Sequence, residues 1–392
     1  MSEGAAKLED SISATKRQMP WRQTLTSELI KGKSLQIGDG YRAKNSELGS
    51  SGLPFARAGN INNGFRFESA DYLPHTYAAR VGDKLSRPGD TVFTSKGTVG
   101  RFAYVRETTE PFVYSPQLCF WRSLKVEDIV PRFLFFWMQS KEFLEQVEGT
   151  KGQTDMADYV NLADQRRMTI TLPPAAEQRA IAELLGTLDD KIDLLRRQNQ
   201  ALEAMAETLF RQWFGDDAGA HWTEGTVEEL FELQRGYDLP TQHRVDGSFA
   251  IVASSGYSGH HHEHKVKGPG VVTGRSGLIG QVFLVKEDFW PLNTTLYVKT
   301  FKRATPAFAY LFLKTMDLGA FNAGSAVPTL NRNHVHANAT RLPPRDLIER
   351  FESIVAPLFD KIHFNTGQTR SLEALRDNLL PKLMSGKIRV AC

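Results

Sequence analysis

The residues best suited to chemistry in this chain are basic and amide side chains beside glycines, in loops of both halves of the sequence. The candidates are Arg57, Asn60, Asn62, Arg66, Lys96 and Arg101 in the first half, and Arg235, Tyr237, His262, Arg275 and Ser276 in the second. Arginine and lysine donate hydrogen bonds to guanine, and asparagine pairs with adenine. Glycine lets a backbone approach a groove closely. A single such residue is more often an ordinary surface group, so their recurrence in both halves carries the prediction of DNA-binding loops.

The run His260-His261-His262-Glu263-His264 is the one cluster that suggests a metal. Structural zinc sites draw their ligands from two spaced pairs, and this run has no second pair and no nearby cysteine. Three interpretations stay open: a metal site, solvated loop histidines, or a loop that faces an anionic partner together with Lys265 and Lys267. We predict no metal ligand here.

Catalytic motifs are missing from the sequence. Gly32-Lys33-Ser34 resembles the end of a phosphate-binding loop, but Ser27 stands where that loop requires a glycine. No Asn-Pro-Pro-Tyr or Asp-Pro-Pro-Tyr, as in amino-methyltransferases, occurs in the chain. A glycine fingerprint for a nucleotide cofactor is also missing. The sequence therefore offers no residue set for catalysis.

The elements that must position these loops are duplicated. Leu172-Pro173-Pro174 returns as Leu342-Pro343-Pro344, 170 residues later, and Asp190-Lys191-Ile192 returns as Asp360-Lys361-Ile362 in the same register. From residue 172 to 210, 12 of 39 positions are identical to their counterparts without a gap. A fixed internal repeat dictates the architecture. The repeating unit is a globular domain that begins at a tryptophan, Trp21 or Trp222, and is followed by a long helix.

The globular parts read as mixed α/β. Short β-branched and aromatic runs between turn residues predict strands over 91–94, 102–105, 271–273, 282–285 and 296–298. Segments 132–147 and 307–318 predict short helices, and regular strand–helix alternation is missing. We therefore predict no doubly wound sheet.

After each Leu-Pro-Pro, apolar residues recur every three or four positions, which predicts helices that pack as a coiled coil. The residues expected at the helix–helix contact are Leu188, Ile192, Leu195, Asn199, Leu202, Leu209, Leu358, Ile362, Leu372 and Leu379. Asn199 takes a core position, where a polar residue sets the register at some cost in stability. Pro357 is expected to bend the second helix early. Two ordinary core helices remain the alternative.

The chain of 392 residues exceeds a single hydrophobic core. The expected division is a flexible N-terminal segment 1–20, domain 21–173, helix 174–214, linker 215–221, domain 222–342, and a C-terminal helix with its tail 343–392. A net charge of +3 permits nucleic-acid binding without arguing for it. Cys119 and Cys392 form no disulfide framework, and the first residues lack the apolar core of a signal peptide. A cytoplasmic location is therefore expected.

On these motifs the chain resembles the specificity subunits of type I restriction–modification systems. The resemblance covers Trp21 to Val390. Its strongest carriers are Leu172-Pro173-Pro174 with Glu177-Gln178, then Phe210 to Phe214, and the ending Lys382 to Arg389. The second copy has Leu347-Ile348 in place of Glu177-Gln178.

The resemblance implies two target-recognition domains, each reading half of a bipartite DNA site, and an antiparallel helix pair that serves as spacer and as docking surface. The implied partners are double-stranded DNA, two modification (methyltransferase) subunits and restriction subunits. S-adenosylmethionine would be held by the modification subunit and ATP with Mg by the restriction subunit. This chain would then hold no cofactor and no catalytic residue.

The expected length of the first long helix is consistent with a spacer role. A helix from about Leu188 to Phe214 is roughly 40 Å long at 1.5 Å per residue, close to one turn of B-DNA at about 34–36 Å. The competing hypothesis is a protein-interaction scaffold, two α/β modules on a helical hairpin that read no DNA. Steeply salt-dependent binding to a specific duplex separates the two.

Overall fold

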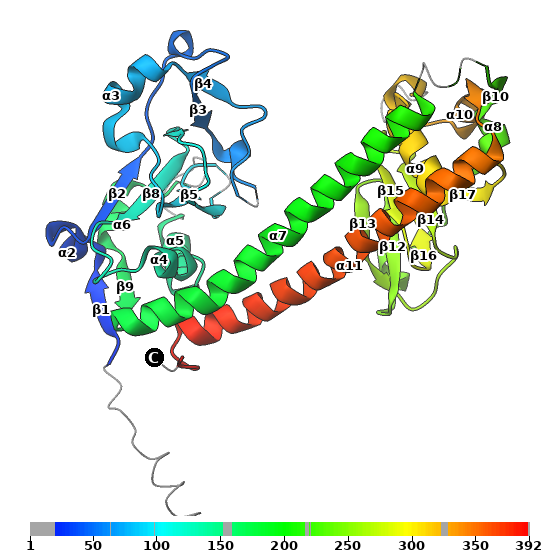
Figure 1. Ribbon diagram of the computed structural model, residues 1–392. Coiled ribbons are helices and arrows are strands. Elements are labelled where there is room, and N and C mark those ends of the chain that lie inside the picture. Colours follow the sequence, from blue (N-terminus) through cyan, green and yellow to red (C-terminus); the bar gives the residue numbers. More distant parts are fainter. Residues whose placement is uncertain are drawn as a thin grey trace, which may run out of the picture. The chain divides into compact units, whose positions relative to one another are not determined.

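The computed structural model describes residues 20–62, 64–97, 99–151, 159–215, 219, 221–322 and 328–390. The expected N-terminal segment (apart from Pro20), most of the expected linker and Cys392 lie outside these residues. The chain divides into two compact units, of which unit 1 is Met1–Lys191 with Leu372–Cys392 and unit 2 is Ile192–Ser371. Each unit therefore contains one globular domain and parts of both long helices (Figure 1).

Two sheets build the first domain. Its four-stranded antiparallel sheet has the order β2 (Leu35–Asp39), β8 (Leu118–Ser123), β5 (Thr91–Thr94) and β6 (Phe102–Tyr104). Its three-stranded sheet has the order β4 (Asp71–Leu73), β3 (Leu53–Ala56) and β7 (Val113–Tyr114), with β3 and β7 parallel. A separate antiparallel pair, β1 (Arg22–Leu25) and β9 (Thr169–Leu172), joins the start of the domain to its end.

The second domain repeats this topology strand for strand. Its four-stranded sheet has the order β11 (Phe231–Arg235), β17 (Thr295–Phe301), β14 (Gly270–Gly274) and β15 (Val282–Val285). Its three-stranded sheet has the order β13 (Gly256–His261), β12 (Phe249–Ala253) and β16 (Phe289–Pro291), again with one parallel pair, β12 and β16. The closing pair is β10 (Thr223–Thr226) with β18 (Ala339–Leu342). The mixed α/β class and the duplication are confirmed.

Short helices cover these sheets. They are α2 (Thr26–Lys31), α3 (Ala78–Val81), α4 (Pro131–Trp137), α5 (Lys141–Lys151), α6 (Leu162–Arg167), α8 (Val227–Leu230), α9 (Pro306–Thr315) and α10 (Arg332–His336). The 3-10 turns are η1 (Asn45–Glu47), η2 (Ala58–Asn60), η3 (His75–Tyr77), η4 (Gly82–Lys84), η5 (Thr241–His243) and η6 (Leu318–Phe321). The single helix expected over 132–147 is in fact two, because the chain turns at Met138 to Ser140. The helix expected over 307–318 ends at Thr315.

Each domain has its own core, in which a largely apolar helix, α4 or α9, packs on the four-stranded sheet. In the first domain α4 is buried, and the rings of Trp121, Trp137 and Phe143 pack together at 5.3–5.9 Å. In the second domain Phe308 of α9 occupies the corresponding place, with Phe231 and Phe312. Proline begins both α4 and α9, where its missing N–H costs nothing.

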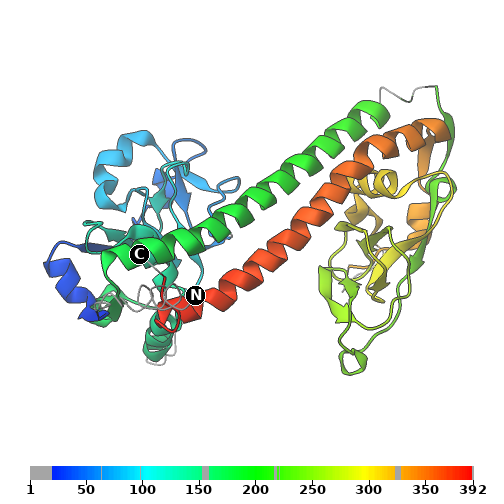
Figure 2. The same cartoon turned by 60° about the horizontal axis from the view of Figure 1, so that its bottom comes forward.

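The two long helices are α7 (Ala175–Phe214) and α11 (Arg345–Met384), each of 40 residues, and each starts directly after a Leu-Pro-Pro. The helix continues through Pro357. In unit 2 the helices run antiparallel, since Asn199 bonds Thr366 while Phe210 packs on Phe351. Figures 1 and 2 show α7 (green) beside α11 (orange to red). None of the helices in the described residues combines the length and apolar content of a membrane span.

The residues expected at the helix contact are placed as follows. Ile192 and Leu195 are 1% exposed, and the other eight are half-buried. Leu209, Leu358 and Ile362 pack against the core of unit 2, and Leu379 packs against that of unit 1.

A buried polar layer crosses the helix pair in unit 2. Asn199 Oδ1 accepts a hydrogen bond from Asn365 Nδ2 at 2.9 Å, and Asn199 Nδ2 donates to Thr366 at 3.2 Å. Asn365 is fully buried, and its Oδ1 has no hydrogen-bond partner among the described atoms. The polar core position predicted at Asn199 is thus matched by a second amide on α11.

A repeated aspartate ties each long helix to its domain. Arg132 donates two hydrogen bonds to Asp190 at 2.7 and 2.8 Å, and Asp360, the counterpart of Asp190, pairs with Lys286 at 2.6 Å. The hydrogen bond from Arg132, aided by Arg106, lowers the pKa of Asp190 against the opposing effect of burial. Gly186 permits this contact, because a Cβ there would lie 2.7 Å from Arg132 Nε.

Glu177 and Gln178 make hydrogen bonds to other parts of the same chain. Gln178 Oε1 accepts the N–H of Val130 at the start of α4. Glu177 accepts hydrogen bonds from Trp21 Nε1 and from Arg389 of the tail. Their absence from the second copy is a structural difference, because Glu352 of α11 accepts the N–H of Ala307 at the start of α9 and so replaces Gln178.

Candidate nucleic-acid interface

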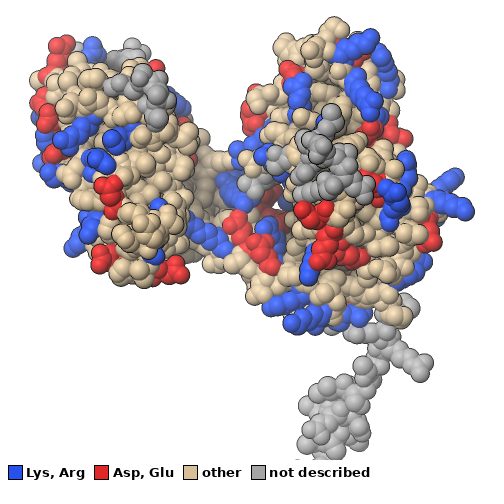
Figure 3. All heavy atoms as spheres, turned by 180° about the vertical axis from the view of Figure 1, so that it is seen from behind, with Lys and Arg blue, Asp and Glu red and all other residues tan. Residues whose placement is uncertain are grey.

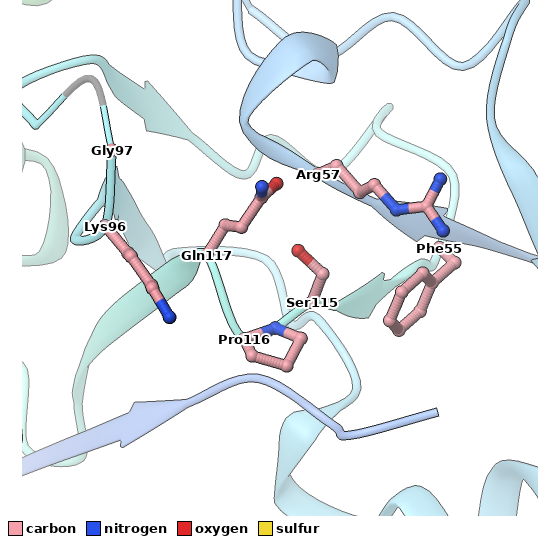
Figure 4. Close-up of a pocket in the computed structure, with 7 residues that line it drawn as sticks. All are labelled: Phe55, Arg57, Lys96, Gly97, Ser115, Pro116 and Gln117. Carbon is pink, nitrogen blue, oxygen red and sulfur yellow. The ribbon is translucent and has the colours of Figure 1, made fainter. Parts of the chain in front are cut away.

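In the first domain, three backbone segments meet at the ends of strands β3, β5 and β7. They surround a hollow of about 410 Å³ lined by Phe55, Arg57, Lys96, Gly97, Ser115, Pro116 and Gln117 (Figure 4). Backbone hydrogen bonds fix the segments to one another, from Ser115 N to Ala56 O and from Ser95 N to Gln117 O, both at 2.9 Å. The hollow is therefore part of the sheet framework.

Arg57 is held in place at the edge of the hollow. Its Nη1 lies 2.5 Å from Asp71 Oδ2, and its guanidinium lies 5.5 Å from the centre of the Phe55 ring. Both partners of the ion pair are about half exposed. The guanidinium therefore keeps donors that face outward.

Gln117 lies between Lys96 and Arg57 (Figure 4). Its Oε1 accepts the N–H of Ala58 at 3.1 Å, so its Nε2 is directed outward as a donor. Below it, Ser115 is 1% exposed, and its buried hydroxyl has no hydrogen-bond partner among the described atoms. An unsatisfied buried hydroxyl costs free energy, which a ligand that reaches it would recover.

The other candidates of the first domain differ in availability. Asn62, Arg66 and Arg101 are exposed, and Arg101 Nη1 donates to Ala58 O at 3.3 Å. Asn60 is only 7% exposed and its amide is used internally, bonding Arg57 N and Arg66 O. The structure brings Arg57, Lys96 and Arg101 to one rim and places Asn60 beneath it.

The same framework exists in the second domain with different side chains. Ser254 N donates to Thr294 Oγ1 as Ala58 N does to Gln117, and Leu292 N donates to Val252 O as Ser115 N does to Ala56. Gly97 and Gly277 both have positive φ, 83° and 87°, as do Gly100 and Gly280, 102° and 93°. The equivalent pairs are Arg57 and Ala253, Lys96 and Ser276, Ser115 and Leu292, and Gln117 and Thr294.

The candidates of the second domain lie along a broader surface. Arg235 and His262 are exposed, Arg235 lying 3.6 Å from Asp238. Arg275 is half-buried, and its Nη1 donates to Asn293 O at 3.0 Å. Tyr237 bonds the hydroxyl of Tyr297 at 2.9 Å and packs near Trp290, so its role is partly structural. Ser276 is half-buried at the position of Lys96.

The histidine run is spread over different environments. His261 is buried and bonds the backbone of Val245, and His264 lies 3.4 Å from Asp288. Within the described residues, no group of three His, Cys, Asp or Glu side chains has a metal-site arrangement. Figure 3 shows Lys and Arg side chains interspersed with acidic ones on the face in view. DNA contact would therefore depend on local groups such as the rim of the hollow.

Gln117 and Ser115, which line the hollow, are not among the candidates predicted from the sequence. They lie in the turn Ser115-Pro116-Gln117 between two buried β-runs. That proline turn was the available signal, because side chains in a short turn at the end of a sheet are presented together.

Comparison with known proteins agrees with this duplicated architecture. A family model described as "Type I restriction modification DNA specificity domain" matches residues 35–204 and again 220–373, which together make up more than half of the chain. The two matches fall on the two copies of the domain-and-helix unit.

Individual relatives point the same way. The chain is 23% identical over 345 residues to the MjaIX specificity subunit of Methanocaldococcus jannaschii, covering 77% of this chain and 78% of that protein. It is 26% identical over 138 residues to the HindI specificity subunit of Haemophilus influenzae, covering 34% of this chain and 29% of that protein. The crystal structure of a type I restriction–modification S subunit from M. genitalium shares the fold, with a TM-score of 0.62 at 16% identity over 95% of this chain and 97% of that one. The chain therefore belongs to the family of type I restriction–modification DNA specificity subunits, and it carries two copies of the DNA specificity domain.

Proposed function

We propose that each target-recognition domain reads one half of a bipartite DNA site, and that the α7–α11 pair docks two modification subunits. The observation that carries this proposal is the pairing of one framework with two side-chain sets. The two domains share strand order and glycine turns, yet Arg57, Lys96, Ser115 and Gln117 at the hollow are all replaced by different residues in the second domain. Such a molecule suits a DNA target with two different halves.

In this proposal the chain is a recognition subunit without catalysis of its own. S-adenosylmethionine belongs to the modification subunits, and ATP with Mg belongs to restriction subunits. The side chains of the rim offer donors for DNA rather than a nucleophile or a base paired with one. In this proposal the chain determines which DNA site is bound, and its partner subunits catalyse the reaction.

The outer face of the helix pair in unit 2 supports the docking role. In the heptad that puts Asn199 at position a, the second domain packs on e positions, through Glu203 with Tyr310 and through Glu352 with Thr305. Position g lies on the other flank of the seam, with c beside it.

Large apolar side chains are exposed on that other flank. Leu194, Met205, Ile354 and Phe364 occupy c or g positions and are 40–56% exposed. All six c and g positions from Leu194 to Gln212, and all six from Ile354 to Ser371, are exposed, and Lys361 is the only charged residue among them. Depletion of charge around large apolar residues is the composition of an interface core.

The exposed apolar residues of the two helices occur in pairs related by the internal repeat. Leu194 and Phe364 are 170 positions apart, as are Leu184 and Ile354, and Met205 and Leu375, and all six are exposed. A surface given twice in one chain is suited to two copies of one partner. This repetition favours the modification subunits as occupants.

Methylome sequencing of the host, with and without the reading frame of this chain, tests the proposed function. The expected result is methylation at a motif of two short defined segments separated by an undefined spacer, which disappears when the chain is deleted. Unchanged methylation after deletion would refute the proposal.

A further inference from the structure

We propose that the hollow bounded by Arg57, Lys96, Ser115 and Gln117 reads a guanine, and that it does so only in the half-site of the first target-recognition domain. This inference rests on the proposed function, because it specifies what one domain recognises. The second domain has the same backbone framework without these groups.

The side chains around the hollow present donors. Gln117 offers Nε2 because its Oε1 is engaged by Ala58 N, and Arg57 keeps guanidinium donors beyond the one that faces Asp71. No hydrogen bond or ion pair is found for the Lys96 ammonium group among the described residues. In the major groove guanine is the base whose edge carries two acceptors, N7 and O6, and no donor. Adenine and cytosine present an amino group, which would face another donor here.

The surroundings of Arg57 and Ser115 favour a base edge over a phosphate. Asp71 compensates the charge of Arg57, and the Phe55 ring lies under the guanidinium, 5.5 Å from its central carbon. Phosphate binding depends on uncompensated positive charge, whereas a base edge requires fixed direction. The buried hydroxyl of Ser115, without a partner at the bottom of the hollow, is a further directed group that a surface phosphate contact would not need.

The second domain has lost each of these features. Ala253 replaces Arg57, Ser276 replaces Lys96, Thr294 replaces Gln117, and Leu292 puts an apolar side chain where Ser115 has its hydroxyl. Thr294 Oγ1 is already used by Ser254 N. The second domain must therefore recognise its half-site through other groups, so the two half-sites differ in how they are read.

The test uses the assembled complex with its modification subunits and a panel of duplexes that vary one base pair at a time. The variants Lys96→Ser and Gln117→Thr give the first domain the residues of the second, and Ser115→Leu fills the hollow. Each is expected to reduce the preference for guanine at one position of one half-site, roughly 5- to 100-fold, with the other half-site unchanged. Lys141→Ser is the matched control, because it removes an exposed lysine of the same domain whose one ion pair among the described residues is with Glu145.

A second arm needs no variant. Duplexes with 7-deazaguanine at each guanine of the half-site, offered to the unaltered complex, lack only the N7 acceptor. One such position should reproduce the loss, and Gln117→Thr should lose little more on that duplex. Equal weakening on all sequences with a shallower salt dependence would show phosphate binding and overturn the guanine assignment, as would unaltered preference in every variant. A complex without any sequence preference would instead sink the proposed function itself.

Discussion

Three arginines of the first domain have different roles, which shows that residue type alone does not determine whether an arginine is structural or available for binding. Arg122 is 4% exposed and makes two hydrogen bonds to the buried Asp90 at 2.6 and 2.7 Å. Tyr114 donates a third to the same carboxylate, and burial, then Asp90, raises the pKa of Tyr114 so that it stays a donor. Arg132 binds α7 through Asp190, and Arg57 faces solvent at the hollow. The sequence singled out Arg57 as a candidate DNA-binding residue, which stays a prediction. It did not indicate the structural roles of the other two arginines, because their burial depends on strands that pair across distant residues.

The buried and exposed pairs should respond very differently to loss of the arginine. Arg122→Met leaves the Asp90 charge buried and should lower the free energy of unfolding by about 3–5 kcal/mol. Arg57→Met removes a half-exposed pair and should cost no more than about 1 kcal/mol. Urea denaturation of the two variants measures both values. An Arg122→Met chain as stable as the parent would disprove the structural role of the buried pair.

At the scale of elements, the long helices were the most predictable part. The Leu-Pro-Pro motifs predicted where the helices start, the apolar repeat predicted which faces are buried, and Asn199 predicted a polar position in the helix contact. That Asn365 is the residue that bonds Asn199 could not be predicted, because the sequence does not say which core positions of two antiparallel helices meet. Nor did the seam reveal the exposed flank with Leu194 and Phe364, since these residues fall between seam positions.

Acidic substitutions on that flank test the docking surface. Leu194→Glu and Phe364→Glu should each weaken the binding of one modification subunit by about 30-fold or more, because each places a charge in an interface core. The double variant should lose both subunits. Ala204→Glu, exposed on α7 outside the c and g rows, is the control and should bind both. Native mass spectrometry reads the stoichiometry directly, and a double variant that still holds two subunits would show that the surface lies elsewhere.

For the molecule as a whole, the repeat predicted the architecture but not the equivalence of the binding loops. The helices match without a gap at 170 residues, as Asp190 and Asp360 show. In the domains the offset changes along the chain, from 196 between Arg57 and Ala253 to 180 between Lys96 and Ser276 and 177 between Gln117 and Thr294. No ungapped comparison finds these pairs, because loops of different length absorb the changes, and only strand pairing identifies them.

If the two target-recognition domains read their half-sites independently, each domain can be exchanged without affecting the other half-site. The experiment replaces residues 222–342 with the corresponding domain of another specificity subunit and determines the methylated motif by methylome sequencing. We predict a bipartite motif in which one half is new and the other half, including its guanine, is retained. A motif in which both halves change together would show that the two domains do not read their half-sites independently.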